Sequence, residues 1–148
     1  MENGDSIEAG PGLWNFGNGV EEVFDKHIIK SVPGYQLSHF IVSLLSDPFI
    51  RKESKIVDLG CSTGTLCRLL EQRHKDKFPK IIGIDNQKNM IQKASELDKS
   101  GNIEYLVSDI TVDDLPINID MAITFYTLQF IAPSVRQTVV NKIYESLN

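Results

Sequence analysis

One short segment constrains the fold of this chain more than any other: residues 56–64, which read Ile-Val-Asp-Leu-Gly-Cys-Ser-Thr-Gly. An apolar run ends in an acidic residue and a glycine-containing turn, and a helical pattern follows directly. A doubly wound α/β sheet presents its backbone to a nucleoside in this order, at the end of its first strand. Because Gly60 and Gly64 lack a Cβ atom, the chain can turn tightly and a ligand can approach the main chain. The segment predicts a Rossmann-like parallel sheet with a nucleoside site.

A second strand end narrows the choice of nucleoside. The run at 83–85 ends in Asp85, and an acid at that place accepts hydrogen bonds from ribose hydroxyls. A dinucleotide fingerprint also needs three glycines to bring a pyrophosphate onto the helix, but this chain has Gly60, Ser62 and Thr65 there. S-adenosylmethionine has no phosphate and needs only room beside the turn. The spacing favours S-adenosylmethionine over NAD, with a strand–turn–helix that binds nothing as the remaining alternative.

Composition limits the other classes of function. The 148 residues suit one domain, and the net charge of −5 argues against broad contact with nucleic acid. No apolar run is long enough to span a membrane, and the first residues lack the basic start of a secretory signal. Cys61 and Cys67 have neither metal nor redox spacing. We therefore expect a cytoplasmic protein with reduced thiols, no metal site, no membrane and no direct nucleic acid partner.

The chain is expected to contain one folded domain. Residues 1–13, rich in glycine, predict a flexible lead-in. Residues 14–148 form the nucleoside-binding domain, and 14–50 are its N-terminal helical cap. Pro33-Gly34 separates two amphipathic helices in this cap. Their apolar positions are Val20, Val23, Phe24, His27 and Ile28 in the first, and Leu37, Phe40, Ile41, Leu44 and Leu45 in the second.

Strands and helices alternate after the cap. The patterns predict strands over 55–59, 80–85, 102–107 and 119–125, and helices over 64–75, 87–99 and 134–147. This order implies a parallel sheet with right-handed crossovers. The first and fourth strands should be neighbours, with the ligand crevice where the strand order reverses.

With these motifs in place, the chain resembles the class I S-adenosylmethionine-dependent methyltransferase superfamily. More narrowly, it resembles the carboxy-S-adenosyl-methionine synthase family, whose product serves wobble-uridine modification of transfer RNA. The likeness covers nearly all of Trp14–Asn148. It is carried by the segments 14–16, 23–24, 31–35 (Ser-Val-Pro-Gly-Tyr), 58–62, 84–86, 109–110 and 127–130 (Thr-Leu-Gln-Phe).

The resemblance implies roles for the glycine turn. Gly60, Cys61 and Ser62 would lie against the amino acid part of S-adenosylmethionine or its carboxylated form. Asp58 and Gly64 complete the candidate set at this turn. Asp58 has an alternative role, since an acid at the first strand often orders the turn instead of touching the ligand.

The remaining candidates come from other strand ends and from the cap. By resemblance, Asp85 would hold the ribose hydroxyls, and Asn86 would lie beside the adenosine. Asp109 would accept a hydrogen bond from the adenine amino group, while Ile110 packs on the ring. Tyr35 would close the site. The alternatives are a turn carboxylate for Asp109 and an ordinary aromatic at a helix start for Tyr35.

The family attaches a carboxyl group, derived from prephenate, to the methyl carbon of S-adenosylmethionine. The resemblance therefore implies a small-molecule substrate, and we expect a homodimer. Two features depart from the family: Phe125 replaces an asparagine of the ligand site, and the arginine that pairs with the new carboxylate lies beyond Asn148. A methyltransferase with Phe125 in its acceptor pocket and a catalytically silent binding domain stay open. The sequence assigns no catalytic residue, and His39 and His74 fall in no motif.

The fourth predicted strand raises a question about the edge of the sheet. A complete methyltransferase-type sheet has seven strands, and four are predicted here. Residues 119–125 read as an apolar strand at an open edge, which favours pairing with another chain. We expect either a fragment of a longer protein, the favoured interpretation, or an edge that is covered by oligomerisation.

Overall fold

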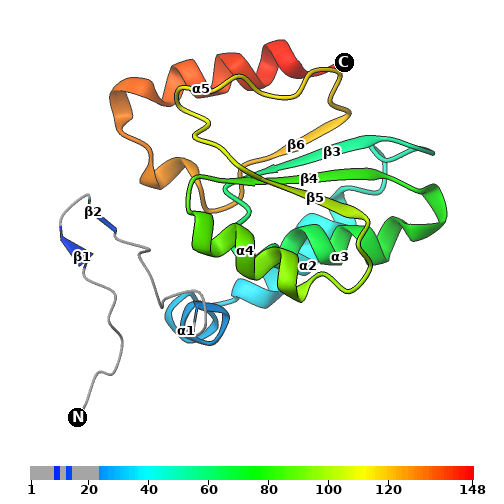
Figure 1. Cartoon of the computed structure of the whole chain (residues 1–148), viewed down its shortest axis with the longest axis horizontal. Helices are drawn as coiled ribbons and strands as arrows, with labels where there is room; N and C mark the ends of the chain where they lie inside the picture. Colours follow the sequence, from blue (N-terminus) through cyan, green and yellow to red (C-terminus); the bar gives the residue numbers. More distant parts are fainter. Residues whose placement is uncertain (1–8, 11–12, 15–23) are drawn as a thin grey trace.

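A four-stranded parallel sheet forms the centre of the molecule (Figure 1). The computed structural model describes residues 9–10, 13–14 and 24–148. The sheet has the order β5-β4-β3-β6, with strands β3 (Lys55–Leu59), β4 (Lys80–Asp85), β5 (Ile103–Val107) and β6 (Met121–Ile123). The pairs β3–β4, β4–β5 and β3–β6 are all parallel. The predicted fold class is confirmed, as is the reversal of strand order between β3 and β6.

Helices cover both faces of the sheet (Figure 1). Two lie on one face, α3 (Thr65–His74) and α4 (Lys88–Leu97), and α5 (Pro133–Ser146) lies on the other. Short 3-10 turns follow α3 and precede α5, at η1 (Lys75–Lys77) and η2 (Leu128–Phe130). Except for the fourth strand, the strands and helices predicted from residue 55 onward are confirmed to within two residues. Among the described residues, no helix is both long and apolar enough to cross a membrane.

Alternate residues of the strands build two apolar layers. Ile56 of β3 packs in the layer under α3 and α4, with Leu70 and Ile81. Its neighbour Val57 faces the other way and packs in the layer under α5, with Val139. A parallel sheet with both faces covered needs apolar residues on both sides of its strands, as β3 has.

The helical cap contains α1 (Phe24–Ser31) and α2 (Tyr35–Leu45), preceded by a short antiparallel pair of β1 (Ala9–Gly10) and β2 (Leu13–Trp14). The first predicted helix is confirmed from Phe24 onward. Its residues Val20 and Val23, and Phe16 of the family resemblance, lie outside the described residues. The flexible lead-in and the domain boundaries stay predictions.

The packed face of α2 is polar. The five apolar positions of the predicted helix face, from Leu37 to Leu45, are all exposed, whereas His39, Ser43 and Ser46 near it are buried. The hydroxyl of Ser46 lies 2.6 Å from Nε2 of the buried His74 in α3 and donates to the carbonyl of Ser43. Small hydroxyl side chains satisfied in this way let this polar face of α2 pack on α3, beside the apolar contact of the partly buried Val42 with the same core layer.

The fourth strand is shorter than predicted. The prediction of a strand over 119–125 is wrong at both ends, because β6 covers Met121–Ile123. Beyond it the backbone leaves the extended conformation, with φ of 56° at Tyr126. Before it, Ile119 forms a parallel bridge with Leu147: the amide of Ile119 donates to the carbonyl of Ser146 at 3.0 Å. At Ile119 the predicted open edge is therefore paired with the chain itself.

Candidate functional site

A cavity of about 860 Å³ opens at the carboxyl ends of the strands, beside the place where their order reverses. Its walls come from the cap helices, the glycine turn after β3 and the loops after β4, β5 and β6. The structure brings eight of the ten predicted site residues into its lining: Tyr35, Gly60, Cys61, Ser62, Asp85, Asn86, Asp109 and Ile110.

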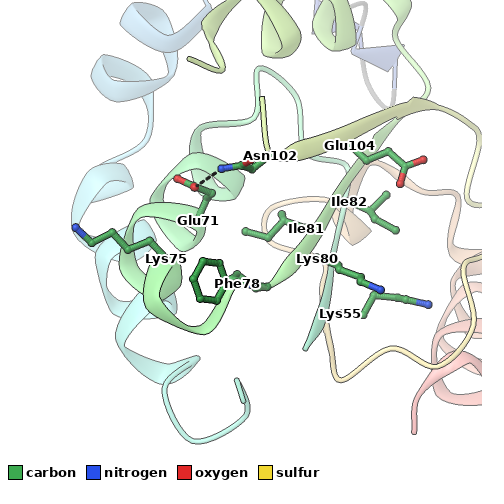
Figure 2. Close-up of a pocket in the computed structure, with 10 residues that line it drawn as sticks. Lys55, Glu71, Lys75, Phe78, Lys80, Ile81, Ile82, Asn102 and Glu104 are labelled. Carbon is green, nitrogen blue, oxygen red and sulfur yellow. Dashed lines mark hydrogen bonds between the residues drawn. The ribbon is translucent and has the colours of Figure 1, made fainter. Parts of the chain in front are cut away.

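A second cavity, of about 550 Å³, lies at the other end of the strands, where β3 and β4 begin (Figure 2). Lys55 and Lys80, the first residues of β3 and β4, line it together with Phe78. The amide of Asn102 donates to the carboxylate of Glu71 at 3.2 Å in its wall. None of the predicted site residues lines this cavity, so the candidate site is the one at the carboxyl ends.

The glycine turn is held against β4 and the loop after β6. The amides of Gly60 and Cys61 both donate to the carbonyl of Ile84, at 2.7 and 2.9 Å. Gly60 has φ of 84°, and a Cβ there would lie 2.5 Å from Cγ2 and Oγ1 of Thr127. Thr127 Oγ1 in turn donates to the carbonyl of Leu59 at 2.8 Å. The close approach of Thr127 therefore requires glycine at position 60.

Asp85 is fixed at the end of β4. The amide of Ser62 donates to its Oδ2 and the amide of Gln87 to its Oδ1, each at 2.9 Å. Burial raises the pKa of this carboxyl, and the two amides oppose that shift. Each carboxylate oxygen has a second lone pair. Asp85 can therefore accept two hydroxyl hydrogen bonds from a ligand without losing its backbone contacts.

Asp58 and Gly64 lie outside the cavity lining. The carboxyl of Asp58 is buried and accepts a hydrogen bond from the Cys67 thiol at 3.5 Å, and burial raises its pKa to about 7. Gly64 has φ of 74°, and a Cβ there would lie 2.5 Å from the Tyr105 hydroxyl. This placement favours the alternative role of Asp58, which is to order the turn.

Asp109 makes the contacts of a turn carboxylate and also lines the cavity. Its Oδ1 accepts from the amide and hydroxyl of Thr111, at 2.9 and 2.7 Å, as a turn carboxylate does. Its own amide donates to Asp113 at 2.8 Å. The residue nevertheless lines the cavity, beside the buried side chain of Ile110. Oδ2 of Asp109 remains available for a ligand.

A hydrogen bond joins the cap to the glycine turn. Thr63 is buried, and its hydroxyl donates to Asp25 Oδ1 of α1 at 2.7 Å. Neither residue was predicted as a site residue. Thr63 lies inside the glycine motif, but only the folded chain shows that Asp25, 38 positions away, faces it.

An aromatic cluster closes the cavity between α2 and the loop after β6. The rings of Tyr35 and Tyr126 stack with 5.9 Å between centroids, and Phe125 lies 4.3 Å from Tyr126. The ring of His39 is 4.2 Å from Tyr35 and meets Phe125 edge-on at 5.2 Å. The hydroxyls of Ser38 and Tyr126 are 3.3 Å apart. All four rings line the cavity.

His39 is the functional candidate that sequence reasoning missed. Its Nδ1 lies 2.8 Å from the carbonyl of Tyr35, one helical turn earlier, and burial lowers its pKa. The spacing of four residues from Tyr35 was the available signal, because such positions share one face of a helix. Within the part of the chain that the structure describes, no three His, Cys, Asp or Glu side chains are grouped to hold a metal.

Comparison with protein families gives one matching model, described as "Methyltransferase domain", over residues 56–148. Among curated proteins, the chain is similar to the carboxy-S-adenosyl-L-methionine synthase of Yersinia pestis (strain Pestoides F). The two are 34% identical over 150 residues, which cover 97% of this chain and 56% of that protein. A second synthase, from Yersinia pseudotuberculosis serotype O:3 (strain YPIII), matches to the same extent. The chain thus spans about half the length of these relatives.

Solved structures show the same fold. A TehB-like SAM-dependent methyltransferase from Corynebacterium glutamicum ATCC 13032 has a TM-score of 0.61 at 21% identity, covering 71% of this chain and 55% of that one. The plantazolicin methyltransferase BpumL, in complex with SAH, has a TM-score of 0.68 at 14% identity, covering 90% of this chain and 51% of that one.

Proposed function

This chain belongs to the methyltransferase domain family, and we propose that the cavity at the carboxyl ends of its strands binds S-adenosylmethionine as the donor of a transferase. The observation that carries the proposal is the position of Asp85. Its carboxylate ends β4, lines the cavity and is bonded to the amide of Ser62 in the glycine turn. We propose that this carboxylate accepts the ribose hydroxyls, beside the turn that would take the amino acid part.

The other lining residues fit the rest of the cofactor. Asn86 would lie beside the adenosine, Asp109 Oδ2 would accept from the adenine amino group, and Ile110 would pack on the ring. The turn from Gly60 to Ser62, which lines the cavity, would receive the amino acid part. The bound cofactor supplies an electrophilic carbon on a sulfonium. The protein positions that carbon and excludes water from it.

The reaction proposed from the resemblance is carboxyl transfer from prephenate to the methyl carbon of S-adenosylmethionine, for wobble-uridine modification of transfer RNA. Its support is the similarity to carboxy-S-adenosyl-L-methionine synthases over 97% of this chain. The expected cytoplasmic location is part of the same proposal and rests on the sequence alone.

A second candidate reaction is methyl transfer to a small molecule, and the lining of the cavity favours it. Phe125 lines the cavity and offers a carboxylate no hydrogen bond. No lysine or arginine among the described residues lines it either. Residues 1–23, of which most lie outside the described part, also contain no lysine or arginine. A dicarboxylate such as prephenate would find no lysine or arginine to pair with in these residues.

We also propose a homodimer. Its support is the exposed apolar surface of α2, where Leu37, Phe40 and Leu45 are 50–62% exposed. Exposed apolar patches of this kind mark interaction surfaces. Light scattering of the chain and of a Phe40→Glu variant tests the proposal. A mass of two chains that falls to one in the variant supports it, and a wild-type monomer contradicts it.

Native mass spectrometry of the purified chain, followed by turnover assays, tests the reaction. Bound carboxy-S-adenosyl-methionine, with prephenate-dependent turnover, supports carboxyl transfer. Bound S-adenosylmethionine or S-adenosylhomocysteine, with methylation of added acceptors, supports the methyltransferase. Binding without turnover leaves a silent binding domain. A chain that binds no adenosine-containing ligand contradicts all three.

A further inference from the structure

The aromatic cluster offers a flat, uncharged surface at the cap end of the cavity. The ring centroid of Tyr126 lies 5.9 Å from that of Tyr35 and 4.3 Å from that of Phe125. Tyr126 holds this position with φ of 56°, an unfavourable value for a bulky residue. Aromatic surfaces of this kind bind planar rings by stacking and edge-to-face contacts. The lack of lysine and arginine in the described lining argues for a neutral ring over a carboxylate.

His39 supplies the polar group of this surface. Because a carbonyl oxygen cannot donate, the 2.8 Å contact with the carbonyl of Tyr35 places the ring proton on Nδ1. Nε2 then carries the lone pair of the ring, and the contact with Tyr35 is the one hydrogen bond of His39 found among the described residues. Burial lowers the pKa of the imidazole. Two ionisable residues act on the His39 imidazole: Asp25 of α1, and Tyr35 on the same helix as His39. A third, Tyr126, packs against Phe125 in the loop after β6.

From this geometry we propose that the protein methylates the hydroxyl group of planar aromatic molecules bound in this cavity. Nε2 of His39 acts as the general base. The proposal rests on the proposed S-adenosylmethionine site. The ring lies against Phe125 and Tyr126, and its hydroxyl faces Nε2. The O–H proton passes to Nε2, and an oxygen lone pair forms the bond to the methyl carbon. The carbon–sulfur bond breaks with its electron pair going to sulfur. The products are an aryl methyl ether and S-adenosylhomocysteine, and His39 later releases the proton to solvent.

Binding of simple probes tests the substrate class apart from turnover. The protein is saturated with S-adenosylhomocysteine and titrated with 2-naphthol, with cyclohexanol as a control that has a hydroxyl but no planar ring. We expect binding of 2-naphthol only, weakened about tenfold or more by Phe125→Ala, the loss typical of an aromatic contact. Equal binding of both alcohols, or binding of 2-naphthol that Phe125→Ala leaves unchanged, overturns the aromatic surface.

The role of His39 has its own test. His39→Asn keeps a donor near the position of Nδ1 and removes the base. We expect kcat for methylation of 2-naphthol to fall about 10²- to 10⁴-fold, with unchanged affinity for S-adenosylhomocysteine. In the wild type, kcat/KM should rise with pH as the imidazole loses its proton, with a midpoint below the usual histidine pKa of about 6.5. In the His39→Asn variant, kcat/KM should not show this rise. Unchanged kcat in the variant overturns the role.

Two further results keep the inference separate from the proposed function. Nitrogen-15 NMR of the wild-type protein should show the His39 ring neutral, with its proton on Nδ1, at pH 7. A proton on Nε2 overturns the inference even if the variant does not fold. S-adenosylhomocysteine that binds without any methylation of 2-naphthol overturns the inference alone. A protein that binds no S-adenosylhomocysteine overturns the proposed function as well.

Discussion

The carboxylate of Asp25 accepts a 2.7 Å hydrogen bond from the hydroxyl of Thr63, and this contact ties the helical cap to the glycine turn. Thr63 is buried with a relative exposure of 1%. It stands between Ser62 and Gly64, so any movement of α1 acts directly on the turn that lines the cavity. The position of the cap and the shape of the candidate cofactor site are therefore linked.

Removing this hydrogen bond should loosen the cap. Thr63→Val keeps the shape of the side chain but leaves the Asp25 carboxylate without its donor. We expect the free energy of unfolding to fall by about 1.5–3 kcal/mol, as for hydrogen bonds to charged groups. Urea denaturation measures the change, and the exposed Thr138→Val serves as a control. In a double-mutant cycle with Asp25→Ala, strictly additive effects would contradict the linkage.

Alanine substitutions at Gly60 and Gly101 distinguish the cost of a strained backbone from the cost of a steric clash. Both have positive φ, 84° and 67°, but a Cβ at Gly101 meets nothing within 4 Å, whereas one at Gly60 meets Thr127 at 2.5 Å. Gly101→Ala should cost about 1 kcal/mol, the usual penalty for a side chain in this region. Gly60→Ala should cost clearly more and weaken S-adenosylhomocysteine binding. Equal losses of stability in thermal unfolding would show that the contact with Thr127 does not matter.

The buried carboxyl of Asp58 should make stability depend on pH. Burial raises its pKa to about 7, whereas an unfolded chain titrates at about 3.9. The folded state thus holds the proton more tightly, so its contribution to stability is present below pH 4 and lost as pH rises through 7. Asp58→Asn removes this dependence. The free energy of unfolding of Asp58→Asn minus that of the wild type should therefore increase from pH 5 to pH 8, because only the wild type loses stability over this range. A constant difference in urea denaturation would mean that Asp58 stays charged.

The sequence was sufficient for three of the four strands of the sheet and for eight residues of the cavity lining. The strands at 55–59 and 80–85 are found at the predicted bounds, because apolar runs that end in glycine or acid leave little choice of register. Since the carboxyl ends of parallel strands meet at one edge, Asp85 and Asp109 reach the same cavity as Gly60.

The cap could not be predicted in the same way. The apolar residues of α2 predict one buried face, but the packed side of that helix consists of His39, Val42 and Ser43, with Ser46 just after its end. Periodicity reports which residues are apolar, not which polar ones will find partners in the folded chain, as Ser46 finds His74. For the same reason the sequence did not identify His39 as a site residue. Its position in the site depends on its contact with Phe125, which is far away in the sequence.

The most direct test of the central claim is calorimetric titration of S-adenosylhomocysteine into the wild-type chain, Asp85→Ala and Asp76→Ala. Asp76 lies in η1 and lines neither cavity, so it serves as a matched carboxylate control. We expect one molecule bound per wild-type chain, unchanged affinity in Asp76→Ala and no detectable binding in Asp85→Ala. The reason is that two hydrogen bonds to a charged group, each worth about 1.5–3 kcal/mol, are lost. Equal affinity in all three proteins would contradict the assignment of the cavity as the cofactor site.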